Sequence, residues 1–119
     1  MENSGNLITE KGFHFAIRIV RLYRYLCGTK HEFVLSKQVL RSGTSIGANI
    51  SESRHAQSRA DFITKMSIAL KEADETFYWL QLLHASGYLS QRQAESILKD
   101  CDELISILSS IVKTSKQNS

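Results

Sequence analysis

Apolar residues recur at the spacing of an α-helix along nearly the whole chain, and no proline interrupts them. Proline breaks helices and is common in the turns of all-β proteins, so its absence from 119 residues favours long helices. The spacing predicts helices at about residues 10–27, 34–54, 59–86 and 91–113, followed by a polar tail over 114–119 that frays. Because short connectors make neighbouring long helices antiparallel, we expect an all-α, up-down four-helix bundle that forms a single domain over residues 1–119.

Local signals mark the ends of these helices. Ser58 and Ser90 are followed three residues later by Asp61 and Gln93, which is the pattern of a capping box at a helix N-terminus. Gly28 follows the first helix, at the position where a left-handed residue often ends a helix and where glycine adopts that conformation with the least strain. The third helix should likewise end at Gly87. The helical wheel of the first helix places one apolar set inward: Phe13, Ala16, Ile17, Val20, Tyr23 and Cys27. On the inward faces of the third and fourth helices we expect five residues to be nearly fully buried: Phe62, Leu80, Ile97, Leu104 and Leu108.

Several classes of protein are disfavoured by the sequence. Cys27 and Cys101 form no CxxC pair, and both lie on apolar stripes, where a cysteine is usually a small buried hydrophobe. Glu52 and His55 form a single ExxH unit on an outward face, so we expect no metal site there. No serine stands in a nucleophile elbow, and we therefore expect no enzymatic activity and no cofactor. Without an apolar run of membrane-spanning length or a signal peptide, a cytoplasmic protein with no membrane contact is expected.

The basic residues are concentrated in the first half of the chain. Residues 1–60 hold nine Lys and Arg against four Asp and Glu, whereas residues 61–119 hold six against eight. Basic and aromatic residues recur at helical spacing on the first helix, and a shorter basic run follows on the second. Spaced cations beside an aromatic ring suit phosphate contacts and base stacking. The candidate nucleic-acid-binding residues are Arg18, Arg21, Arg24, Lys37 and Arg41; the alternative is an ordinary solvated helix face with snorkelling arginines.

Small and polar residues distinguish the second helix. Gly43 and Gly47 lie one turn apart, and because glycine destabilises a helix interior by roughly 1 kcal/mol, we expect tight packing against another helix to compensate. Asn49 falls on the inward stripe, where a buried amide needs hydrogen-bond partners. Its expected role is a polar contact between helices; ligand binding is the alternative.

The third helix carries apolar residues on two faces. Besides its inward stripe, Ile68, Trp79 and Leu82 line up with Glu75 on the opposite side. In an isolated four-helix bundle a second apolar face of a helix would be exposed to solvent, so we expect these three residues to form a subunit interface. A locally wide core is the alternative.

The stretch from Leu40 to Glu52 resembles the signature of a bacterial protein family. The resemblance continues through Ala56-Gln57-Ser58, through residues 70–76 with Trp79-Leu80, and through Gly87-Tyr88-Leu89, and it covers most of residues 13–108. On these residues the chain is identified as a member of the four-helix-bundle proteins encoded within intervening sequences of 23S rRNA genes.

This family is similar to the accessory protein of diversity-generating retroelements, a basic ring of five bundles that binds nucleic acid and partners a reverse transcriptase. The resemblance thus implies a homo-oligomer, a pentamer, that binds RNA or DNA, with a reverse transcriptase or another operon product as a possible partner. It supplies no catalytic residues. The alternative function is a protein-interaction scaffold without direct nucleic-acid contact.

Overall fold

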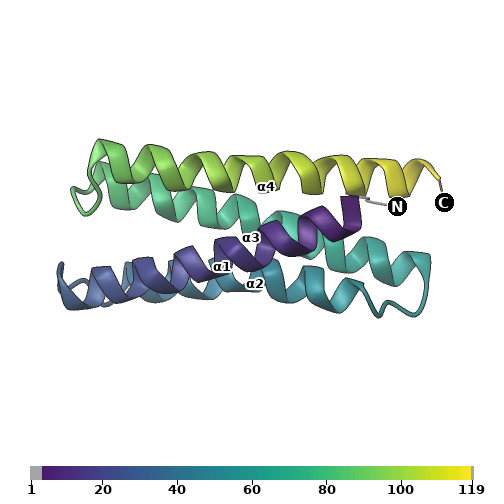
Figure 1. Ribbon diagram of the computed structural model, residues 1–119, viewed down its shortest axis with the longest axis horizontal. Helices are drawn as coiled ribbons and strands as arrows, with labels where there is room; N and C mark the ends of the chain where they lie inside the picture. The colour runs from purple at the N-terminus through teal and green to yellow at the C-terminus, as the bar shows by residue number, and fades with distance from the viewer. Residues whose placement is uncertain (1–3, 119) are drawn as a thin grey trace.

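The computed structural model describes residues 4–118, and four helices account for nearly all of them. They are α1 (Ser4–Gly28), α2 (Leu35–Ser53), α3 (Arg59–Ala85) and α4 (Gln91–Gln117). Consecutive helices run in opposite directions along an elongated body of 46 × 23 × 22 Å, as Figure 1 shows. Each helix packs on its sequence neighbours, and α1 also meets α4, which closes the bundle. The predicted all-α four-helix bundle is confirmed.

Two helix bounds differ from the sequence expectation. The first helix begins at Ser4 rather than near residue 10, because Ile8 is fully buried in the core and needs a helical backbone around it. The fourth helix continues to Gln117 rather than ending near residue 113, with Lys116 in its last turn, where a cation is favoured by the helix dipole. The expected fraying tail is therefore helical over 114–117, and Ser119 lies outside the described residues.

The helix ends follow the capping signals closely, with one exception. Ser90 and Gln93 form a complete capping box, and the Ser58 side chain accepts the backbone N–H of Asp61. After α3, Gly87 adopts a positive φ of 88°, and the N–H of Tyr88 reaches the carbonyl of Leu83 at 2.9 Å, the Schellman arrangement. The exception is Gly28, which is the last residue of α1.

The connector between α1 and α2 takes its left-handed residue from His31, with φ of 54°, and not from Gly28. The next residue, Glu32, turns inward and is only 8% exposed. Its carboxylate accepts the backbone N–H groups of Val34, Leu35 and Ser36, at 3.1, 2.9 and 2.7 Å. Glu32 therefore caps the N-terminus of α2, a role that the sequence analysis missed.

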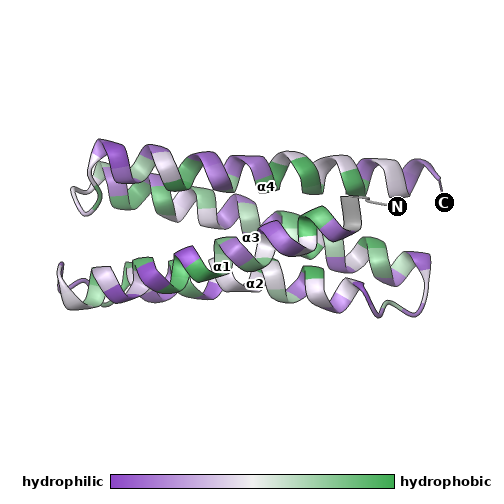
Figure 2. Ribbon diagram, in the orientation of Figure 1, coloured by the Kyte–Doolittle hydropathy of each residue, from purple (hydrophilic) through white to green (hydrophobic). Residues whose placement is uncertain are grey.

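The core is a continuous column of apolar side chains between the four helices, and hydrophobic and hydrophilic segments alternate along every helix in Figure 2. Leu80, Ile97, Leu104 and Leu108 are nearly fully buried, as predicted. Phe62 is only half-buried, contrary to prediction, because it borders a recess at the end of the bundle beside Ser53 and Met66. No helix among residues 4–118 combines the length and the hydropathy needed to cross a bilayer.

The predicted inward face of α1 is wrong. Phe13 is 66% exposed and Val20 is 37% exposed. The residues that enter the core instead are Ile8, Phe15, Ile19, Leu22 and Leu26. Together with Gly12 they recur at alternating intervals of four and three residues. The first helix therefore carries two apolar stripes, and the stripe predicted to face the core is the outer one.

Glycines determine which stripe of α1 faces inward. A Cβ built on Gly43 would lie 2.7 Å from Ile19 Cγ1, and one built on Gly47 would lie 3.1 Å from the carbonyl oxygen of Gly12. The backbones of α1 and α2 therefore approach closely at these points, with the stripe containing Gly12 and Ile19 in the contact. The tight packing predicted for Gly43 and Gly47 is confirmed.

Candidate nucleic-acid interface

The five candidate basic residues differ in their electrostatic surroundings. Arg18, on α1, donates to the Asp100 carboxylate of α4 at 2.6 Å and to the Ser96 hydroxyl at 3.0 Å. Arg41, on α2, forms ion pairs with Glu72, at 3.2 Å, and with Glu75 on α3. These two guanidinium groups already have carboxylate partners, so a phosphate would have to compete for them.

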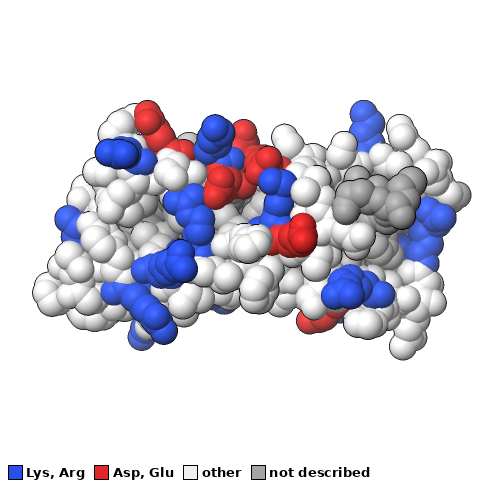
Figure 3. All heavy atoms as spheres, viewed as in Figure 1, with Lys and Arg blue, Asp and Glu red and all other residues white. Residues whose placement is uncertain are grey.

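Arg21, Arg24 and Lys37 have a different environment. All three are exposed, and none forms an ion pair with another of the described residues. Arg21 and Arg24 lie three residues apart on α1, which places them on neighbouring positions of one helix face. Figure 3 shows Lys and Arg side chains gathered on the half of this face where α1 ends, with acidic side chains above them along α4.

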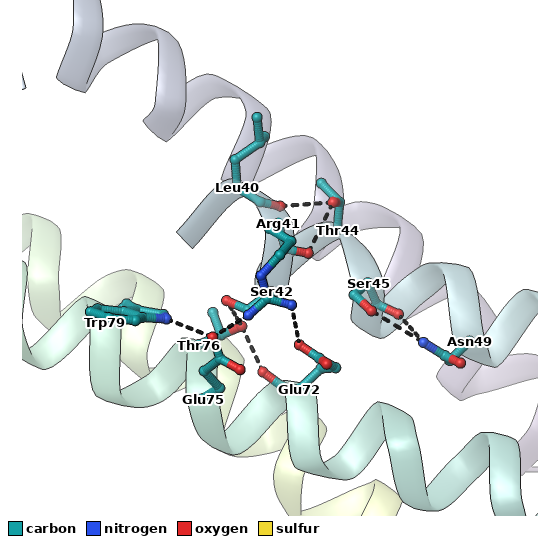
Figure 4. Close-up of polar contacts among 10 residues, drawn as sticks. All are labelled: Leu40, Arg41, Ser42, Thr44, Ser45, Asn49, Glu72, Glu75, Thr76 and Trp79. Atoms are coloured by element: carbon teal, nitrogen blue, oxygen red, sulfur yellow. Dashed lines mark hydrogen bonds and ion pairs between the residues drawn. The ribbon is translucent and has the colours of Figure 1, made fainter. Parts of the chain in front are cut away.

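Two residues of the signature stretch, Arg41 and Ser42, form a polar network with α3, drawn in Figure 4. The Thr76 hydroxyl donates to Ser42 Oγ at 2.8 Å, and both side chains are completely buried. At the surface of the same contact, Arg41 reaches Glu72 and Glu75, while the indole N–H of Trp79 donates to Glu75 at 2.9 Å. The signature residues thus fix how α2 and α3 pack.

The Glu75 carboxylate is held ionised by this network. The hydrogen bond from Trp79 outweighs burial and, together with Arg41, lowers the pKa of Glu75 below its ordinary value. The carboxylate is then available as the partner of Arg41 throughout the neutral pH range.

Asn49 does not make the interhelical contact that was expected of it. Its amide nitrogen donates to the carbonyl oxygen of Ser45 at 2.9 Å and to the Ser45 hydroxyl at 3.2 Å, both within α2. The buried polar contact between helices is made by Ser42 and Thr76 instead. Ser42 was recognisable as an inward position, but nothing in the sequence identified Thr76 as its partner.

The proposed interface residues of α3 are each partly exposed. Ile68 is 36% exposed, and Leu82 is half-buried. Trp79 packs partly against the core while its indole bonds to Glu75, so it contributes to the bundle itself. Tyr78 is 56% exposed, and its ring packs edge-on against that of Trp79. Tyr78 is therefore a further exposed aromatic residue beside the proposed interface, and it was not predicted from the sequence.

The side chains considered for metal binding or catalysis lie in no cluster of possible metal ligands among the described residues. Glu52 is exposed and pairs with Lys65 at 3.0 Å, and His55 is exposed beyond the end of α2. In the described part of the chain, no three His, Cys, Asp or Glu side chains come together as a possible metal site. Burial raises the pKa of the Cys101 thiol to about 12, so this side chain behaves as a small core residue.

The seam between α1 and α4 is the least extensively packed of the four helix contacts. Two ion pairs bridge it, Arg18 to Asp100 and Lys11 to Glu103, the latter at 3.0 Å. Two recesses of about 570 and 350 Å³ open along this seam, and Arg18 and Arg21 line both of them. The basic residues are recognisable in the sequence, but the position of α4 beside them is not.

Comparison with known proteins relates the chain to one family. Residues 5–110 match the family model described as 23S rRNA-intervening sequence protein. The fold is similar to the crystal structure, at 1.70 Å resolution, of a protein of unknown function from the S23 ribosomal protein family of Bacteroides thetaiotaomicron VPI-5482. That chain is 55% identical, with a TM-score of 0.92, and the match covers 93% of this chain and 99% of the other. Curated proteins give no match.

Proposed function

Because the chain belongs to the family of 23S rRNA-intervening sequence proteins, we propose that it binds RNA or DNA in the cytoplasm as a ring-shaped homo-oligomer, without catalysing a reaction. The observation that carries the proposal is that three of the five candidate cations, Arg21, Arg24 and Lys37, are exposed and form no ion pair with another described residue. Such cations can neutralise phosphates and release counterions without first breaking a contact within the protein.

The paired arginines have a secondary role in this proposal. Arg18 and Arg41 must exchange a carboxylate for a phosphate, so their net contribution to binding is smaller than that of Arg21 and Arg24. They still add positive charge near the contact surface, which attracts an anionic polymer over a distance of about one Debye length.

Assembly of several copies increases the affinity of a modest basic surface. A heterologous contact that closes on itself produces a ring, and the proposed ring is a pentamer whose contact includes Ile68, Trp79 and Leu82. Each protomer then presents the same cations to one polymer, and binding by the second and later protomers becomes intramolecular. A reverse transcriptase or another operon product is the protein partner to test on this assembly.

Charge reversal tests the nucleic-acid contact directly. The affinities of labelled single-stranded and duplex RNA and DNA are measured between low and physiological salt for the parent and for Arg21→Glu with Arg24→Glu. Each lost phosphate contact should flatten the dependence of log affinity on log salt by about 0.7 for single strands and 0.9 for duplex DNA. A matched control, Arg59→Glu with Lys71→Glu, reverses two exposed charges on α3, which does not contact α1.

The outcomes separate the two candidate functions. We expect the α1 double variant to bind far more weakly and the α3 control to retain most of the affinity. Equal losses in both variants would mean that overall charge, and not this surface, governs binding. A parent protein that binds neither polymer at low salt would refute the proposal and leave the protein-interaction scaffold as the function.

A further inference from the structure

The smaller recess on the α1–α4 seam differs in chemistry from its larger neighbour. The larger one includes the carboxylates of Asp100 and Glu103 in its lining, which would repel a phosphate. No acidic residue lines the smaller one, which we call the Tyr25 recess. Its lining residues are Arg18, Arg21, Leu22, Tyr25, Leu89, Gln93 and Ile97.

The Tyr25 recess combines an apolar floor with polar groups at its edge. Leu22, Leu89 and Ile97 are each at most 9% exposed, so the floor is part of the bundle core. The ring of Tyr25 is half-buried against the same core. A flat, partly exposed aromatic side chain packed on an apolar floor is a suitable surface for stacking a planar group.

Gln93 adds a fixed hydrogen-bond donor. Its side-chain oxygen accepts the backbone N–H of Ser90 at 2.8 Å in the capping box of α4. This contact occupies the oxygen and leaves the amide nitrogen of Gln93 to donate to a ligand, since no other described residue accepts from it. A donor in this place suits the carbonyl and ring-nitrogen acceptors on the edge of a nucleobase.

We propose that the Tyr25 recess binds one unpaired base of a single-stranded nucleic acid, stacked on Tyr25, with its edge on Gln93 and its phosphate on Arg21. The inference rests on the proposed function and specifies which form of nucleic acid is preferred. A volume of about 350 Å³ accommodates one nucleobase. A base inside a duplex is paired and stacked and cannot enter such a recess, so the site favours single strands.

Two variants test the recess without altering the cations. Tyr25→Leu removes the stacking surface, and Gln93→Glu replaces the donor with an acceptor while keeping an oxygen for the capping box, in which Glu is as suitable as Gln. Their controls are Phe13→Leu, which removes an exposed aromatic side chain of α1 outside the recess, and Gln81→Glu, which makes the same change as Gln93→Glu at an exposed position of α3. The probes are a labelled oligouridylate and a labelled RNA duplex at low salt, with circular dichroism and light scattering to verify folding and assembly.

The parent should bind the oligouridylate more tightly than the duplex. Because stacking of one base on an aromatic side chain contributes about 1–3 kcal/mol, Tyr25→Leu should weaken oligouridylate binding by about five- to 150-fold. Gln93→Glu removes a hydrogen bond worth about 0.5–1.5 kcal/mol and should weaken it by about two- to tenfold. Neither variant should weaken duplex binding more than its control does. Should Tyr25→Leu fail to fold, Gln93→Glu still decides the question. Folded recess variants that bind the oligouridylate like the parent would overturn the base site alone if Arg21→Glu with Arg24→Glu still weakens binding. A parent that binds neither probe overturns both proposals.

Discussion

The cap that Glu32 places on α2 should make a large and pH-dependent contribution to stability. Three backbone N–H groups at the start of α2 depend on this one carboxylate, at 2.7 to 3.1 Å. Glu32→Gln removes the charge and turns one oxygen into a donor that faces other donors. Loss of an N-terminal cap costs about 0.5–2 kcal/mol, and a hydrogen bond to a charged group contributes about 1.5–3 kcal/mol. We therefore expect the free energy of unfolding to fall by about 2 kcal/mol.

The pH dependence distinguishes this explanation from a general loss of packing. Burial alone would raise the pKa of Glu32, but the backbone hydrogen bonds from Leu35, Ser36 and Val34 together outweigh burial and lower it. Because the pKa is lower in the folded protein, the carboxylate stabilises the fold at neutral pH, and this contribution is lost as the pH falls through the folded pKa. The stability difference between parent and variant should therefore be constant above about pH 5 and shrink below about pH 4, since an unperturbed Glu has a pKa of about 4.3.

Urea unfolding at matched protein concentration, followed by circular dichroism between pH 3 and 7, measures this difference. In a separate thermal unfolding experiment at neutral pH, the midpoint temperature of the variant should be about 8 °C below that of the parent. This shift corresponds to a loss of about 2 kcal/mol in a domain of this size. Glu10→Gln, at an exposed position of α1, is the control and should change neither quantity. A loss for Glu32→Gln that is the same at pH 3 and pH 7 would refute the role of the carboxylate charge.

Three further changes test the packing and the assembly. Leu104→Ala should lower the free energy of unfolding by about 2–5 kcal/mol in a urea titration, because Leu104 is 1% exposed in the core. Gly43→Ala should cost about 1–3 kcal/mol, since its Cβ would meet branched atoms of Ile19, whereas Gly28→Ala has no neighbour to displace and should be nearly neutral. Ile68→Glu should give folded monomers by light scattering, and a parent that is already monomeric at micromolar concentration contradicts the assembly proposal.

Helical spacing in the sequence was sufficient to predict the four helices and four of the five core positions named on α3 and α4. It failed on α1, where Phe13 and Val20 repeat as regularly as Phe15 and Ile19. Periodicity alone cannot choose between two apolar stripes on one helix. The choice depends on the partner helix, because the missing side chain of Gly43 leaves room for Ile19, and the backbone of Gly47 packs closely on that of Gly12.

The candidate site was predictable only as a set of charges. The spacing of Arg18, Arg21 and Arg24 is visible in the sequence, but which of them already has a partner depends on α4, far along the chain. Asp100 neutralises Arg18 because the fold brings residues 82 positions apart into contact. The Tyr25 recess likewise combines residues of α1 with residues near the start of α4, and no local pattern signals it.

The order of the helices around the bundle also has a consequence for the speed of folding. Three of its four helix seams join helices that are consecutive in the sequence, and only the thin α1–α4 seam joins segments from opposite ends of the chain. Most native contacts therefore close short loops, and helical proteins with such low contact order fold within microseconds to milliseconds. The ion pairs on the α1–α4 seam are partly exposed, and pairs of this kind contribute little, so the seam should close last and open first.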